Sequence, residues 1–113
     1  MVLYESDRTR LEELKSFIDE HIHEKLVIAA LAERYGMSTR TLQRQFLAMY
    51  REPVFNYIHR KRMQTAMNII TSRTMRISQT AYAVGYRSLP SFVKAFTKYY
   101  GHPPTYYAGF AND

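Results

Sequence analysis

The chain has 113 residues, no cysteine and a formal net charge of +6 at pH 7. This length suits one compact unit or two very small ones, and the lack of cysteine excludes disulfides and thiolate metal sites. No apolar run is long enough to span a membrane, and the N-terminus lacks a signal-peptide core, so we expect a soluble cytoplasmic protein with no membrane partner.

The charge is unevenly distributed along the chain. Residues 1–35 hold five Lys or Arg and eight Asp or Glu, a net charge of −3. Residues 36–113 hold eleven Lys or Arg and two Asp or Glu, a net charge of +9. A segment this basic attracts a polyanion, either a nucleic acid or an acidic membrane surface. We discount the membrane surface because a repeat, described below, accounts for the apolar stripes.

Apolar residues recur with helical spacing along almost the whole chain, and no segment shows a convincing strand period. We therefore predict an all-α fold of about seven helices. The first carries Leu11, Leu14, Phe17 or Ile18, and Ile22 on one face; the others cover about 27–35, 39–50, 53–71, 78–85, 89–100 and 104–110. The predicted start signals are a Thr9–Glu12 capping box, the caps Ser38, Ser78 and Ser88, and the prolines Pro53 and Pro104.

One device occurs twice in the sequence. The pairs that match at an offset of 49 are Ile28 and Ile77, Ala32 and Ala81, and Gly36 and Gly85. Those that match at an offset of 50 are Ser38 and Ser88, Leu42 and Phe92, Phe46 and Phe96, Tyr50 and Tyr100, and Pro53 and Pro103. Each copy reads as a helix, a tight turn at glycine and a second helix, which is typical of a DNA-binding helix-turn-helix. A single copy would equally suit an ordinary helical hairpin, but two copies on a basic chain favour DNA binding.

The sequence resembles the DNA-binding domain of the AraC/XylS family of bacterial transcription regulators. The resemblance rests on IAALAERYGMSTRTLQRQF, FNYIHRKRMQTAMNII and, most specifically, AYAVGYRSLPSFVKAFTKYYGHPPTYY. It implies two helix-turn-helix subdomains, residues 1–52 and 73–113, joined by a linker helix over 53–72. It also implies a sequence-specific regulator that places recognition helices 39–50 and 89–100 in successive major grooves. A helix of about 19 residues would be roughly 28 Å long, close to the roughly 34 Å of one DNA turn.

The exposed positions of the two recognition helices supply the candidate contacts. Arg can bond a guanine edge through two atoms and Gln can bond adenine, whereas apolar groups can touch only thymine methyls. The candidate base contacts are Arg40, Gln43, Arg44, Leu89, Pro90, Ser91, Val93 and Lys94. The candidate phosphate contacts are Ser38, Thr39, Thr41, Arg87, Ser88 and Lys98. Leu89 and Pro90 depart from the family's usual polar residues, so we expect the N-terminal unit to carry most of the sequence specificity.

Other chemistry is sparse. His21 and His23 point away from each other on a helix, and the acids of the first helix read as a solvated face. We therefore expect no enzyme activity, no metal, no cofactor and no small-molecule ligand in this chain. The alternative function is a helical module that binds RNA polymerase or another regulator and hardly reads DNA, with the acidic first helix as its partner surface. Arg62 lies on the apolar side of its helix, and we interpret it as a brace between the subdomains.

Overall fold

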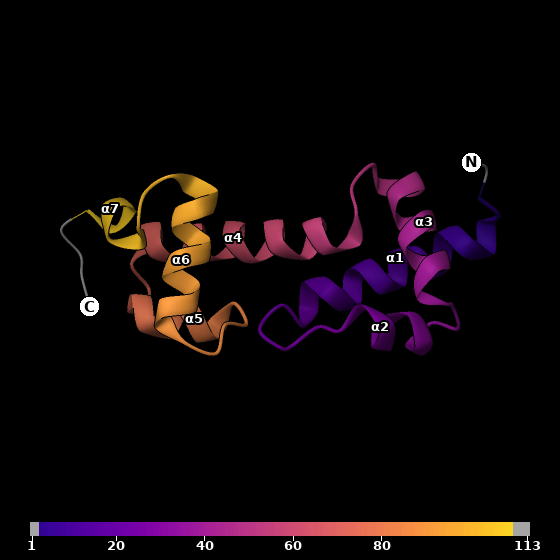
Figure 1. The fold of residues 1–113 in the computed structure, drawn as a ribbon, viewed down its shortest axis with the longest axis horizontal. Helices are drawn as coiled ribbons and strands as arrows, with labels where there is room; N and C mark the ends of the chain where they lie inside the picture. Colours follow the sequence, from indigo (N-terminus) through magenta and orange to yellow (C-terminus); the bar gives the residue numbers. More distant parts are fainter. Residues whose placement is uncertain (1–2, 110–113) are drawn as a thin grey trace. The chain divides into compact units, whose positions relative to one another are not determined.

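The computed structural model describes residues 3–109, and every regular element in that range is an α-helix (Figure 1). The helices are α1 (Glu5–Glu20), α2 (Ile28–Arg34), α3 (Thr39–Tyr50), α4 (Val54–Ser72), α5 (Ile77–Ala83), α6 (Leu89–Tyr100) and α7 (Pro104–Ala108). The predicted all-α class is therefore confirmed. The predicted extension of the last helix to Phe110 lies outside the described residues.

The chain divides into two compact units. Unit 1 comprises the residues up to His21 together with Lys25–His59, and unit 2 comprises Ile22–Glu24 together with the residues from Arg60 onward. The division therefore falls within α4. The short segment Ile22–Glu24, which follows α1 in the chain, belongs to unit 2.

In unit 1, α1 and α2 both pack against α3. Leu11, Leu14 and Ile18 of α1 are fully buried at helical spacing, as are Leu42 and Phe46 of α3. Burying a side chain of this size stabilises the fold by about 1.5–3 kcal/mol. This packing holds α3 by one face and leaves its other face to solvent.

In unit 2, α5 and α7 both pack against α6. The core joins Met63 and Ala66 of α4 to Phe92 and Phe96 of α6, all fully buried. The two phenylalanine rings are 5.6 Å apart between centroids, within the range of favourable aromatic pairs. Helix α6 is thus also held by one face.

The repeat extends further than the sequence analysis found. At an offset of 52, the buried residues of α1 match buried residues of α4: Leu11 and Met63, Leu14 and Ala66, and Ile18 and Ile70. Each unit therefore contains three helices in the same chain order, to which unit 2 adds α7. The duplicated element is a first helix followed by a helix-turn-helix.

The turns within the two helix-turn-helix copies have the same hydrogen bonds. In unit 1, Gly36 has φ +71°, and the Met37 N–H donates to the Ala32 carbonyl over 2.8 Å. In unit 2, Gly85 has φ +92°, and the Tyr86 N–H donates to the Ala81 carbonyl over 2.9 Å. This left-handed helix end favours glycine because a side chain there is strained.

Two predicted details of α1 are wrong. Helix α1 begins at Glu5, with Tyr4 as its N-cap, so Thr9 lies inside the helix and forms no capping box with Glu12. Glu5 lies in that first turn, where its negative charge interacts favourably with the positive end of the helix dipole and so favours the earlier start. Helix α1 also ends at Glu20, so Ile22 lies outside it.

The start of α5 also differs from the prediction. Arg76 is the N-cap of this helix, and Ser78 lies in its first turn. The Arg76 N–H donates to Gln79 Oε1 over 3.1 Å, so a glutamine side chain satisfies the helix start in place of a serine cap. The bond from the N-cap N–H to the Gln79 side chain, which is one of the two bonds of a capping box, thus marks the start of α5.

Candidate nucleic-acid interface

Matching hydroxyl pairs cap α3 and α6. Ser38 Oγ accepts from the Thr41 N–H over 3.1 Å and donates to Thr41 Oγ1 over 2.9 Å. Ser88 Oγ accepts from the Ser91 N–H over 3.3 Å and donates to Ser91 Oγ over 2.9 Å. The predicted caps Ser38 and Ser88 are confirmed. Because these hydroxyls already bond within the helix start, the remaining N–H groups of the first turn are the better phosphate donors.

Helix α3 presents a polar row on the face opposite its core contacts. Arg40, Gln43 and Arg44 are all exposed, and their i, i+3 and i+4 spacing places them on one face. Within residues 3–109, no hydrogen bond or ion pair holds their side chains. This face therefore offers two guanidinium groups and one amide to a partner.

Helix α6 presents a different row. Leu89 and Val93 are only partly exposed, because both pack against the unit 2 core. Pro90, Ser91 and Lys94 are exposed. Pro90 lies in the first turn, where its missing N–H removes no helix bond. The face that α6 offers is therefore smaller and less polar than that of α3.

Basic side chains flank α6. Arg87 is exposed in the turn before the helix, and Lys98 is exposed in its last turn. The sequence contains no Asp or Glu between Glu52 and Asp113, so no acid of unit 2 other than Glu24 offsets these charges in the described range. Such a surface favours phosphate contacts. Thr39, the remaining candidate, is half-buried at the first position of α3.

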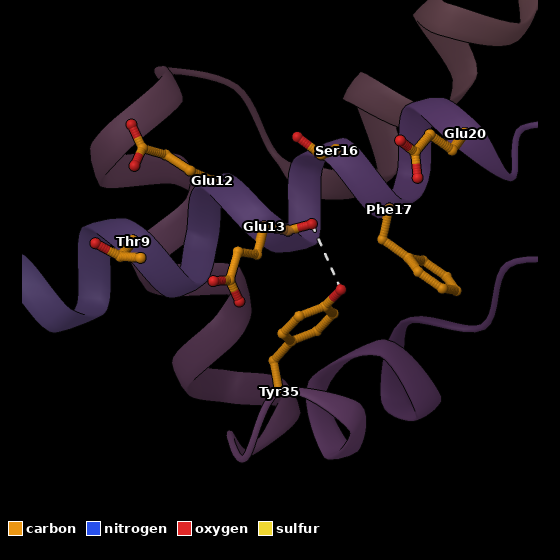
Figure 2. A pocket seen from close by; sticks show the side chains of 7 residues that line it. All are labelled: Thr9, Glu12, Glu13, Ser16, Phe17, Glu20 and Tyr35. Carbon is orange, nitrogen blue, oxygen red and sulfur yellow. Dashed lines mark hydrogen bonds between the residues drawn. The ribbon is translucent and has the colours of Figure 1, made fainter.

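Unit 1 also carries a groove that the sequence analysis missed (Figure 2). It has a volume of about 320 Å³, and its lining residues are Thr9, Glu12, Glu13, Ser16, Phe17, Glu20 and Tyr35. The Tyr35 hydroxyl donates to the Glu13 carbonyl over 3.4 Å. The Arg34 guanidinium lies 4.2 Å from the centre of the Phe17 ring. The three acids are exposed, as the sequence predicts, and their i, i+4 spacing with Ser16 and Phe17 is the signal in the sequence for this groove.

Two further features bear on the classes of site. Within residues 3–109, no three His, Asp or Glu side chains lie close enough to hold a metal ion. None of the helices in the same range has the length and apolar character needed to cross a bilayer.

Comparison with known proteins identifies the family. A family model described as a helix-turn-helix domain matches residues 31–109. The probable transcriptional regulator LumQ of Photobacterium leiognathi is 30% identical over 108 residues, covering 92% of this chain and 42% of LumQ. The chain therefore spans less than half of that relative. The regulatory protein SoxS of Escherichia coli K12 is 29% identical over 97 residues, covering 86% of this chain and 91% of SoxS.

Solved structures agree with this family. The DNA-binding domain of AdpA, solved in complex with a target DNA, has a TM-score of 0.81 at 25% identity, covering 88% of this chain and 89% of that one. An AraC-type regulator from Chromobacterium violaceum shares the fold, with a TM-score of 0.77 at 23% identity, covering 93% and 94%. These relatives are named as transcription regulators, in agreement with the class of protein that the sequence predicts. With two capped helix-turn-helix copies and a family model covering most of its length, the chain belongs to the AraC/XylS family of DNA-binding transcription regulators.

Proposed function

We propose that the chain is a sequence-specific regulator that binds double-stranded DNA by placing α3 and α6 in successive major grooves. The observation that carries the proposal is that unit 2 repeats the turn, cap and core of unit 1 but exposes different side chains. Two helix-turn-helix units that share one fold but expose different side chains suit a DNA site whose two halves differ in sequence. The linker over residues 53–72 would join the two reading subdomains, 1–52 and 73–113.

Helix α3 is the main sequence reader in this proposal. Arg40 and Arg44 would bond guanine edges, and Gln43 would bond adenine. The three side chains are exposed and hold no other partner in the described range, so binding DNA would break no internal bond. Thr39, Ser38 and Thr41 lie at the helix start, where backbone N–H groups would receive a phosphate.

Helix α6 contributes mainly affinity. Lys94, Arg87 and Lys98 would bind phosphates, and Ser91 and Ser88 lie at the helix start beside them. Pro90 would touch a thymine methyl. Leu89 and Val93 would reach bases only with the part of each side chain that the core leaves exposed. A phosphate contact positions the helix without reading sequence.

The second candidate function is a protein-interaction module with little DNA reading. The groove in Figure 2 favours it, because Glu12, Glu13 and Glu20 line the groove together with the aromatic side chains of Phe17 and Tyr35. A basic segment of RNA polymerase or of another regulator would complement this charge. A DNA partner, by contrast, would place the chain on the nucleoid in the cytoplasm.

Selection of binding sites from a random duplex library at moderate salt separates the candidates. An asymmetric motif with two boxes about 10 base pairs apart is the expected result. A single box would restrict reading to α3 and overturn the two-groove part of the proposal. Binding without any motif, lost as salt rises, would leave charge attraction alone and favour the interaction module.

Two substitutions then test the division of labour. Arg44→Ala is expected to cost about 1–3 kcal/mol and to relax preference at one base position. Lys94→Ala is expected to weaken all sequences alike and to lower the salt slope by about 1. Arg8→Ala and Lys25→Ala are matched controls, since both side chains are exposed in unit 1 outside α3. A larger loss of base preference from Lys94→Ala than from Arg44→Ala would reverse the assignment.

A further inference from the structure

An arginine occupies the same place on the first helix of each unit. Arg10 on α1 and Arg62 on α4 are related by the offset of 52 that also matches the buried faces of these helices. Both side chains are half-buried, and in both the Nε atom is buried without a hydrogen-bond partner in the described range. A buried donor without a partner is costly, so its occurrence at two matched positions indicates that the rest of each guanidinium has a use.

In unit 2 the guanidinium lies against the turn that leads into α6. Arg62 Nη2 donates to the Glu24 carbonyl over 2.7 Å. A Cβ atom at Gly85 would lie 3.0 Å from this guanidinium and 2.8 Å from the Ile22 carbonyl oxygen. The turn is therefore enclosed between α4 and the segment Ile22–Glu24.

The enclosed turn is coupled to the recognition helix through an aromatic ring. The Tyr86 ring meets the Phe92 ring of α6 edge to face, with centroids 5.5 Å apart. Burial lowers the pKa of Arg62 and raises the pKa of Tyr86, as expected for groups packed away from water. Arg62 thus lies against the turn at Gly85, and the next residue of that turn, Tyr86, contacts the core side of α6 at Phe92.

In unit 1 the matching arginine also lies at its turn, but more loosely. Arg10 Nη1 donates to the Tyr35 carbonyl over 3.4 Å, and its Nη2 pairs with Asp7 over 2.5 Å. A Cβ atom at Gly36 would lie 3.9 Å from Nη1, an ordinary contact. Both arginines therefore touch the turn immediately before the recognition helix of their own unit.

We infer that Arg10 and Arg62 are positioning residues for DNA recognition, each setting the recognition helix of its own unit through the preceding turn. Neither guanidinium is a DNA contact in this role, and the contacts of Arg62 described above all lie within unit 2. The inference rests on the proposed function, because it assigns α3 and α6 as the helices that are positioned. It adds that residues Ile22–Glu24, from the N-terminal half of the sequence, complete the second reader.

Double-mutant cycles on a duplex that carries both selected boxes test the inference. Arg62→Met and Arg10→Met keep the length of the side chain and remove its donors. Arg62→Met and Lys94→Ala should each weaken DNA binding. In the double variant, the loss of affinity should be at least about threefold smaller than the product of the two single losses, because both residues act on α6. For Arg62→Met and Arg44→Ala, which act on different helices, the loss of affinity in the double variant should equal the product of the two single losses. Arg10→Met should show the opposite pattern, coupling to Arg44→Ala and multiplying with Lys94→Ala.

Amide hydrogen exchange without DNA gives a second readout that does not depend on the proposed function. Arg62→Met should speed exchange of the Phe92 amide, which bonds the Ser88 carbonyl, by about tenfold and leave the Leu42 amide of α3 unchanged. Arg10→Met should do the reverse. Gly85→Ala, which presses on the same turn while retaining Arg62, is the second variant and should reproduce the Arg62→Met pattern.

The outcomes separate the two proposals. A wild-type chain that binds no duplex refutes the proposed function, and the exchange pattern still decides whether each arginine sets its own helix. Effects that multiply in all four pairs, or exchange that rises equally in both units, overturn the positioning role. Unit-specific coupling together with unit-specific exchange supports it.

Discussion

The C-terminal ends of the two recognition helices differ in a way that predicts opposite effects of two substitutions. Arg51 ends α3 at φ +61°, and its N–H donates to the Leu47 carbonyl over 2.9 Å. Gly101 ends α6 at φ +91°, and its N–H donates to the Thr97 carbonyl over 2.8 Å. The same left-handed helix end is thus built once with glycine and once with an arginine that is strained there.

The magnitudes follow from the backbone alone. A left-handed conformation costs a residue other than glycine about 1–2 kcal/mol. Glycine avoids this cost, but because its unfolded chain has more conformational freedom it loses about 0.5–1 kcal/mol more entropy on folding. A Cβ atom at Gly101 would meet nothing within 4 Å, so Gly101→Ala should destabilise unit 2 by about 1 kcal/mol. Arg51 is exposed, so Arg51→Gly should stabilise unit 1 by about 0.5–1 kcal/mol.

Thermal melts followed by circular dichroism would measure both effects. A change of 1 kcal/mol moves the Tm of a domain of this size by about 4–8 °C, and hydrogen exchange would assign each change to its unit. Arg51→Ala is the control, because it removes the charge but keeps the strained Cβ and should change little. If Arg51→Gly left unit 1 unchanged or weaker while Gly101→Ala destabilised unit 2, the strain at Arg51 would not be real.

Three further outcomes are expected. Phe46→Ala should lower the free energy of unfolding by about 3–5 kcal/mol in a urea titration, because the ring is fully buried; a loss below about 1 kcal/mol would contradict its place in the core. Ser88→Ala should cost about 1 kcal/mol through the lost cap, whereas Ser72→Ala, which alters no N-cap, should cost less. Burial raises the pKa of Tyr86 above 10.0, so the phenol stabilises the fold fully below pH 10.0 and this contribution is lost as pH rises through the folded-state pKa. Tyr86→Phe should therefore reduce the loss of stability in alkali, and an unchanged alkaline transition would count against burial of the hydroxyl.

The features that were readable from sequence are those that depend on local backbone chemistry. Gly36 and Gly85 were predicted because a left-handed turn requires glycine, and Ser38 and Ser88 because a helix start requires a short acceptor. Thr9 carried the same kind of signal as Ser38, yet it lies inside α1. A cap motif marks a start only where the upstream chain cannot continue the helix, and nothing in the preceding residues of α1 breaks it.

The features that were not readable join residues far apart in the chain. The hydrogen bond from Arg62 to the Glu24 carbonyl spans 38 residues and uses a backbone oxygen, which no side-chain pattern can indicate. The match between α1 and α4 was hidden for a different reason. Leu14 corresponds to Ala66, so the buried positions agree in burial but not in size, and most of the polar positions differ, with Arg10 and Arg62 as an exception. The pattern of buried positions shows that α1 corresponds to α4, because a position can be buried in both helices even where the residue types differ.

The two copies also explain why the readers can differ in their tasks without a difference in fold. Each unit is built by a turn glycine and a serine cap before the helix and by two buried residues on its core side, Leu42 and Phe46 in α3 and Phe92 and Phe96 in α6. The residues that would read DNA lie on the opposite side, where α3 has Arg40 and Arg44 and α6 has Pro90 and Lys94. Under the proposed function, changing the outer row would therefore alter recognition at little cost in stability. On this argument, exchanging the outer rows between α3 and α6 should move the stronger base preference to the other half of the DNA site and leave both units folded.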